Sequence, residues 1–283
     1  MELPAIVNQL GLIPGLLAII FISMLTKSSI DKILRFSQAS KSSTYSGVAA
    51  DAFGGIGRII LQACIVINNT GRLVVYMIII GDVLSGTWEY GFHHMGVLEE
   101  WFGEYWWTAV LLFTTLFVFA PLISFKRVVL PIENELKDPT QMKLIVRKSL
   151  IFCTAIYITT SFFGVLFGDH ILDDVLANFD ADLGIPYSSL LDDLIRLSYC
   201  LHLMLVFPIV FFSLRLNVDG LLFPYAVPIA ISKRRLVSTT VALMGFIFTK
   251  ANFIPSIRDA FQFTGATAAV CVSYIFPAAI TLR

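Results

Sequence analysis

The chain has 283 residues, of which 57% are hydrophobic and only 14% are charged. Soluble domains carry about a quarter charged residues, and a mean hydropathy of +0.81 is too high for a soluble fold. The composition therefore predicts an all-α, polytopic helix bundle whose partner is the lipid bilayer. The formal net charge is zero, and no nucleic-acid partner is expected.

Seven apolar segments are long enough to cross a bilayer, which takes about 20 mostly apolar residues in a helix. An apolar piece of about ten residues precedes them, is set off by Gly11, and is too short to cross alone. The expected spans cover about 12–34, 56–84, 105–125, 145–168, 190–214, 236–255 and 260–282.

Basic residues gather in alternate loops, while the opposite loops are acidic. One face of the predicted bundle holds 16 of the 20 Lys and Arg residues: Lys27, Lys32, Arg35, Lys41, Arg58, Lys126, Arg127, Lys137, Lys143, Arg147, Lys148, Arg215, Lys233, Arg234, Arg235 and Arg283. Because cytoplasmic loops are enriched in Lys and Arg, this face is predicted to be cytosolic. The regular alternation supports the number of spans.

Motifs for catalysis and cofactor binding are absent from the sequence, including GxSxG, the P-loop and HExxH. The chain is therefore predicted not to be an enzyme and to need no cofactor or metal. His93 and His94 could be a metal pair, but no third ligand is nearby, so an exposed polar loop is favoured. The cysteines lie in apolar runs and are interpreted as small hydrophobic residues.

The second span carries several polar side chains. Asn68 and Arg72 are four residues apart and share one helix face, whereas Gln62 and Asn69 are seven apart and share another. An arginine at mid-span costs about 2.5–3.5 kcal/mol on insertion scales. These groups either line a substrate path or bond to neighbouring helices, with Asn68 capping Arg72.

Two later spans add further candidates. His202 in the fifth span could relay a proton, since its ordinary pKa is near physiological pH; the alternative is a neutral histidine bonded to another helix. The last span contains Thr264 and Thr267 around Gly265-Ala266. Small residues let membrane helices approach closely, so helix packing is the alternative to a substrate path there.

Six stretches carry a family resemblance, among them "ILRFSQASKSSTYSGVAADAFGGIGRIILQACIVINNTGRLVVYMIIIGDVLSGT", "IENELKDPTQ" and "NFIPSIRDAFQFTGATAAVCVSYIFPAAITLR". Through them the chain resembles the amino acid/auxin permease family, in the plant branch similar to sodium-coupled neutral amino acid transporters. The resemblance covers almost the whole chain. It implies a LeuT-like fold of eleven helices with an inverted five-plus-five repeat, in which broken first and sixth helices hold the substrate at the midplane.

Compared with the family pattern, the single domain of residues 1–283 is incomplete. Only Val128–Pro131 separates "FKR" from "IENELKDPTQ", whereas two crossings with their loops would need upward of about 50 residues. The resemblance therefore implies that family helices five and six are missing, with a junction near 127–132. The first half of the broken first helix and the eleventh helix also lack a counterpart.

The resemblance implies a secondary carrier, a symporter for neutral or broadly chosen amino acids, in a plant vacuolar or plasma membrane. Leu205–Pro208 lacks the hydroxyl that sodium-coupled members carry there, which favours the proton as coupling ion. Because both broken helices are largely absent, transport is expected to be impaired. The alternative is a non-transporting seven-span protein that binds or regulates a partner, such as a full-length relative. The substrate-path candidates are Asn68, Asn69, Arg72, His202, Thr264 and Thr267.

Overall fold

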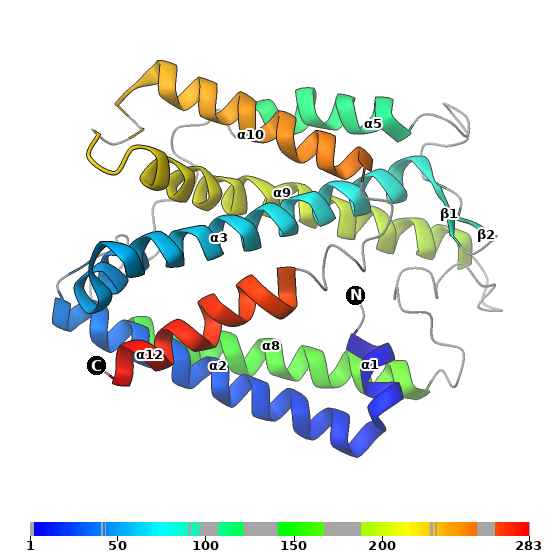
Figure 1. The fold of residues 1–283 in the computed structure, drawn as a ribbon. Helices are drawn as coiled ribbons and strands as arrows, with labels where there is room; N and C mark the ends of the chain where they lie inside the picture. The colour runs from blue at the N-terminus through cyan, green and yellow to red at the C-terminus, as the bar shows by residue number, and fades with distance from the viewer. Residues whose placement is uncertain are drawn as a thin grey trace. The chain divides into compact units, whose positions relative to one another are not determined.

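The fold is known from a computed structural model that describes residues 3–40, 42, 44–89, 92–94, 96, 107–121, 141–166, 188–226, 229, 231–253 and 264–282. The regular elements in these residues are helices and one pair of short antiparallel strands, in which Thr87 lies opposite His94 (Figure 1). The elements are α1 (Leu3–Leu10), α2 (Leu12–Ser40), α3 (Tyr45–Ser85), β1 (Thr87–Glu89), β2 (Phe92–His94), α5 (Trp107–Phe113), η1 (Thr114–Phe119), α8 (Gln141–Leu166), α9 (Ser188–Leu222), α10 (Lys233–Phe253), η3 (Gly265–Ala269), η4 (Cys271–Ile275) and α12 (Phe276–Leu282).

Six helices in the described part of the chain are long and apolar enough to cross a membrane. They correspond to six of the seven predicted spans. The last of these six helices, Gly265–Leu282, consists of the π-helical turns η3 and η4 followed by α12. The predicted span 105–125 is represented by a shorter apolar helix, Trp107–Phe119, and residues 122–125 lie outside the described part. The short first helix, α1, agrees with the prediction.

Two glycines with positive φ mark the breaks in the first three helices. Gly11 has φ 87° between α1 and α2, where the sequence predicted a separation. Gly54 has φ 70° and divides α3 into a short first piece and a long second piece. Side chains other than glycine rarely adopt this conformation. The helix therefore continues toward Tyr45, beyond the predicted start of the span, but changes direction at Gly54.

The helices divide into two compact units. The first comprises Met1–Phe36 and Leu130–Leu194, and the second comprises Ser37–Val129 and Ile195–Arg283. In the first unit, α1 contacts α8, and a Cβ atom added to Gly164 would meet Pro4 at 2.6 Å. A hydrogen bond of 2.7 Å between the hydroxyls of Ser23 and Thr154 joins α2 to α8.

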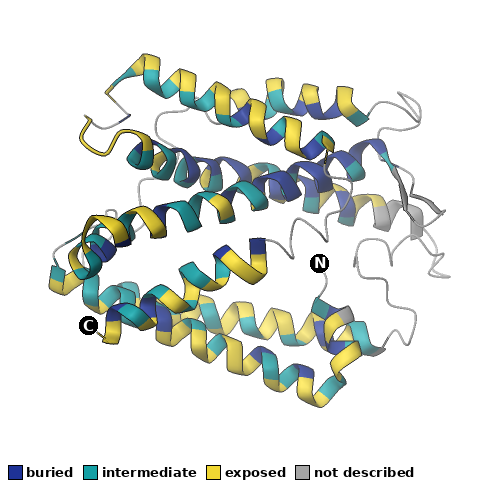
Figure 2. Ribbon diagram, in the orientation of Figure 1, coloured by how far each residue is buried: buried dark blue, intermediate teal, exposed yellow. Residues whose placement is uncertain are grey.

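Helix α3 is the central helix of the second unit. It contacts α5, α10, η3, η4 and α12. From Leu73 to Gly81 it is apolar on all sides, and Leu73, Val75, Met77 and Ile80 are fully buried. Figure 2 shows this end of α3 largely in the colour of buried residues. A helix that is hydrophobic all round is expected in the interior of a bundle. The polar residues of α3 are thus held on the best-packed element of this unit.

Candidate functional site

One strip of α3 faces α9. The Asn69 Nδ2 atom donates a hydrogen bond of 3.1 Å to Ser213 Oγ. Gln62 lies beside Gly220, where an added Cβ would meet its Nε2 at 2.6 Å. From Gln62 to Asn69 the chain advances seven residues on α3, while from Gly220 to Ser213 it goes back seven residues on α9. The two helices are therefore antiparallel along this strip. The predicted shared face of Gln62 and Asn69 is therefore the face turned to α9.

A second strip of α3 contacts the last helix. A Cβ atom added to Gly71 would lie 2.0 Å from Thr264 Cγ2 and 2.9 Å from Thr264 Cβ. Thr264 itself is buried, with 8% of its surface exposed. The side chain of Cys64, seven residues before Gly71, also interacts with that of Cys271, seven residues after Thr264. These contacts support the interpretation of Thr264 as a helix-packing residue, which fits against Gly71.

Asn68 and Arg72 lie on a third strip, between the other two. An α-helix turns by about 100° per residue, so both residues point between the direction of Asn69 and the direction of Gly71. Asn68 is half-buried and Arg72 is exposed. The hydrogen bonds among described side chains include none between Asn68 and Arg72, so the predicted cap is not formed.

The opposite side of α3 and α9 is covered by α5 and η1. Gly81 of α3 lies against Trp107 of α5, and Phe207 of α9 stacks on Phe119 of η1 with ring centroids 3.9 Å apart. Arg72 is nine residues from Gly81, a rotation of about 180° around the helix. The side chain of Arg72 therefore points away from α5 and η1.

His202 lies on an exposed strip of α9 that also holds Leu201, Leu205 and Ile209. It is five residues from Phe207, a rotation of about 140°, so it also points away from η1. Arg72 and His202 are thus both exposed, and each points away from α5 and η1. The antiparallel pairing at Ser213 places them about 12 Å apart along the helix axes. Thr267 is exposed on the last helix.

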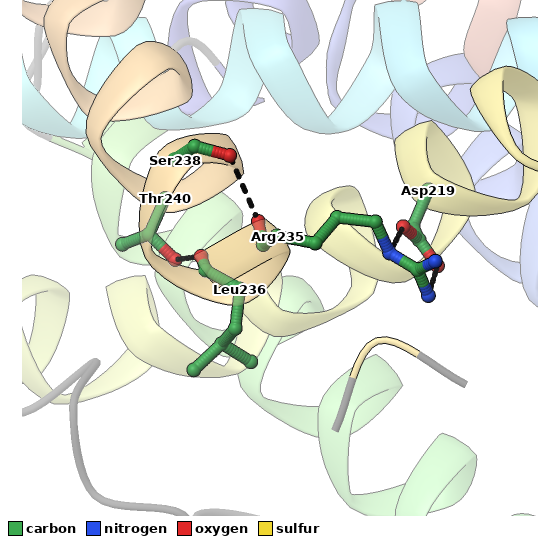
Figure 3. A network of polar contacts seen from close by, with 5 residues as sticks. All are labelled: Asp219, Arg235, Leu236, Ser238 and Thr240. Carbon is green, nitrogen blue, oxygen red and sulfur yellow. Dashed lines mark hydrogen bonds and ion pairs between the residues drawn. The ribbon is translucent and has the colours of Figure 1, made fainter. Parts of the chain in front are cut away.

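A charged contact that the sequence did not predict lies at the basic ends of α9 and α10. Arg235 Nε lies 2.8 Å from Asp219 Oδ1, and Arg235 Nη2 donates to Asp219 Oδ2 at 3.3 Å (Figure 3). Nearby, Arg58 Nη2 donates to the Gly220 carbonyl at 3.4 Å. The contact neutralises an acidic side chain on the predicted cytosolic face and joins α9 to α10.

His93 lies in β2, opposite Trp88. The described residues contain no group of three or more His, Cys, Asp or Glu side chains that could hold a metal ion. The cysteines are free thiols.

Replacing Asn69 with leucine is expected to destabilise the chain by about 0.6–1.7 kcal/mol, the range of interhelical hydrogen bonds measured in a membrane protein. The matched control is Asn68→Leu on the neighbouring strip, which removes no described hydrogen bond and should change stability less. Unfolding in mixed micelles with increasing dodecyl sulfate would measure both. An equal or larger loss for Asn68→Leu would show that Asn69 is not the packing residue.

The chain matches the transmembrane amino acid transporter protein family over residues 1–127 and 90–283. It belongs to this family. Amino acid transporter AVT6A of Arabidopsis thaliana is 47% identical over 355 aligned positions, which include 100% of this chain and 77% of that protein. Amino acid transporter AVT6B of the same plant is also 47% identical, over 100% of this chain and 78% of its own length. No solved structure matches the chain.

A more distant relative is solute carrier family 38 member 10 of Rattus norvegicus, 23% identical over 99% of this chain and 31% of that protein. Membership of the transmembrane amino acid transporter family confirms the predicted resemblance, the multi-pass membrane class and the prediction that the chain is not an enzyme. The alignment with AVT6A has 355 positions, to which this chain supplies 283 residues. The relative therefore has residues inside the aligned range that have no counterpart here.

Proposed function

We propose that this chain descends from a proton-linked secondary carrier of neutral or broadly chosen amino acids, and that the 283-residue form is impaired in transport. The observation that carries the proposal is the alignment itself. It joins the whole chain at 47% identity to a relative named as an amino acid transporter, yet leaves part of that relative without a counterpart. We propose that the part without a counterpart is family helices five and six, with the junction near 127–132, outside the described residues.

Polar side chains of α3 and α9 that point away from α5 and η1 support this proposal chemically. Asn68, Arg72 and His202 are polar groups in membrane-spanning helices, where such groups are costly and usually face a cavity, a partner or a substrate path. They point away from α5 and η1, and we propose that a solute reaches them from that side. On either side of the strip that holds Asn68 and Arg72, Asn69 bonds to Ser213 and Gly71 packs against Thr264.

Transport is impaired because the two charged ends of an amino acid need hydrogen-bonding partners inside the membrane. Transfer of a polar group from water into an apolar medium without a new hydrogen bond costs roughly 2–7 kcal/mol, and an unpaired charge costs far more. Inverted-repeat carriers use the backbone of broken helices on both sides of a midplane site for this purpose. The α3–α9 face supplies one side only, so it can hold a solute but cannot enclose it and release it on the other side.

Proton coupling is proposed from two features of α9. His202 is exposed on the substrate-path face, and histidine changes charge near physiological pH. Leu205–Pro208 supplies no side-chain hydroxyl for a sodium ion. The basic loops are cytosolic by the positive-inside rule, and the membrane is proposed to be the vacuolar or the plasma membrane.

The test is a chimera that restores the AVT6A residues for which this chain has no counterpart. After reconstitution into liposomes, the chimera is expected to accumulate radiolabelled L-alanine or L-glutamine when a pH gradient is imposed. A matched chimera with His202→Gln should lose the response to the pH gradient. Absence of uptake by the first chimera would refute the carrier proposal, and uptake driven by sodium alone would refute proton coupling.

A further inference from the structure

Arg72 is a charged side chain deep in a membrane-spanning helix. It lies 17 residues from Gly55, where the straight part of α3 begins, and 13 residues from Ser85, where α3 ends. With a rise of 1.5 Å per residue, these distances are about 25 Å and about 20 Å. The hydrocarbon core is about 30 Å thick, so Arg72 lies within the core rather than at its edge. Among the residues that the structure describes, no carboxylate pairs with it.

The surroundings of Arg72 restrict which group can bind it. Arg72 is exposed, and the described residues offer it no ion pair or hydrogen bond. The strips on either side of it are occupied by the contacts with Ser213 and Thr264. Asn68, one turn closer to the basic end, shares the strip, is half-buried, and makes no described hydrogen bond. The two side chains form a polar pair bordered by packed helices.

The chemistry of the pair matches the two charged ends of an amino acid. A guanidinium presents parallel N–H groups that bind a carboxylate in a bidentate manner. The Asn68 Oδ1 atom is an acceptor for an ammonium group, and residues four apart on a helix have Cβ atoms about 5–6 Å apart. A lysine at position 72 would keep the charge but lose the planar, bidentate geometry.

We infer that Arg72 and Asn68 form an amino-acid-binding site that works without the broken helices, with Arg72 on the α-carboxylate and Asn68 on the α-ammonium group. The inference rests on the proposed function, because it names the groups of this chain that bind the substrate. It also separates two properties of the chain. The 283-residue form binds amino acids on the α3–α9 face although it does not carry them across.

The experiment is site-resolved protection of Arg72 in the purified full chain, in phosphatidylcholine nanodiscs. Phenylglyoxal modifies accessible arginines, and peptide mass spectrometry measures the rate at Arg72. Exposed Arg234, at the start of α10, is the internal control. L-alanine at ten times its dissociation constant is expected to slow modification of Arg72 about tenfold by mass action, with no effect at Arg234. Propionate should also protect, and ethylamine should not.

A variant of Asn68 separates binding of the ammonium group from binding of the carboxylate. Asn68→Leu should weaken protection by L-alanine and leave protection by propionate unchanged, because only alanine carries the ammonium group. Equal protection of Arg72 by ethylamine, or no protection by alanine and propionate, would overturn the inference. So would protection by oleate alone, which would assign the site to a lipid carboxylate, or an Arg72 that stays unreactive because a co-purifying helix covers it.

The outcome is distinguishable from that of the carrier proposal. If the restored chimera transports amino acids but Arg72 is not protected, the binding-site inference is refuted and the proposed function is supported. Protection of Arg72 together with a chimera that does not transport would sink the proposed function and leave the binding site standing.

Discussion

Replacing Gly71 with alanine is expected to destabilise the chain by about 1–3 kcal/mol, the usual cost of forcing extra atoms into a packed contact. The new Cβ atom would lie 2.0 Å from Thr264 Cγ2 and 2.9 Å from Thr264 Cβ. A rotation of the threonine side chain relieves the first contact but not the second, so the two helix backbones must separate. The loss would appear as unfolding at lower dodecyl sulfate in mixed micelles.

Two further variants make the Gly71 prediction specific. Gly245→Ala in α10 is the matched control, because an added Cβ meets nothing within 4 Å there. It should be neutral or slightly stabilising, since alanine favours helices over glycine. Thr264→Gly should recover part of the loss in the double variant. A Gly71→Ala chain as stable as Gly245→Ala would contradict the close approach of α3 and the last helix.

Replacing Arg235 with methionine is expected to cost about 1.5–3 kcal/mol, the range for hydrogen bonds to charged groups. The side chains of Arg235 and Asp219 are only 15% and 11% exposed, and two of their atom pairs are in contact. Removing the guanidinium leaves the Asp219 carboxylate without this partner, in a poorly solvated position. The neighbouring exposed Arg234→Met is the control and should have little effect on unfolding.

A charge exchange tests whether the Asp219–Arg235 pair itself is responsible. The double variant Asp219→Arg with Arg235→Asp should be more stable than the sum of the two single changes predicts. A double-mutant cycle measures this difference directly. Strict additivity would mean that each residue acts through other contacts and that the ion pair contributes nothing between α9 and α10.

The hydropathy of the sequence predicted the helices because apolar length is what a bilayer requires of a helix. It did not predict where the helices continue outside the apolar core. Helix α3 begins at Tyr45 rather than near 56, and α9 extends to Leu222 rather than near 214. Backbone hydrogen bonds can continue in water after the hydrophobic pattern has ended. The bend at Gly54 depends on a single φ angle, which leaves no periodic signal.

The candidate site was predicted in part. Helical spacing alone placed Gln62 with Asn69 and Asn68 with Arg72, because two residues four or seven apart share a face. The spacing could not show which of the two faces would be covered. That depends on Ser213 and Thr264, which lie more than 140 residues further along the chain. The Asp219–Arg235 contact was missed for the same reason, since its residues belong to different helices.

We propose that the 283-residue chain has the binding face of an amino acid carrier but does not complete the transport cycle. The most direct measurement is uptake of radiolabelled L-alanine and L-glutamine into liposomes containing the purified chain, under an imposed pH gradient, beside the restored chimera. We predict accumulation by the chimera, and for the chain itself no accumulation above that of empty liposomes. Saturable uptake by the 283-residue chain that collapses when the gradient is removed would contradict the claim.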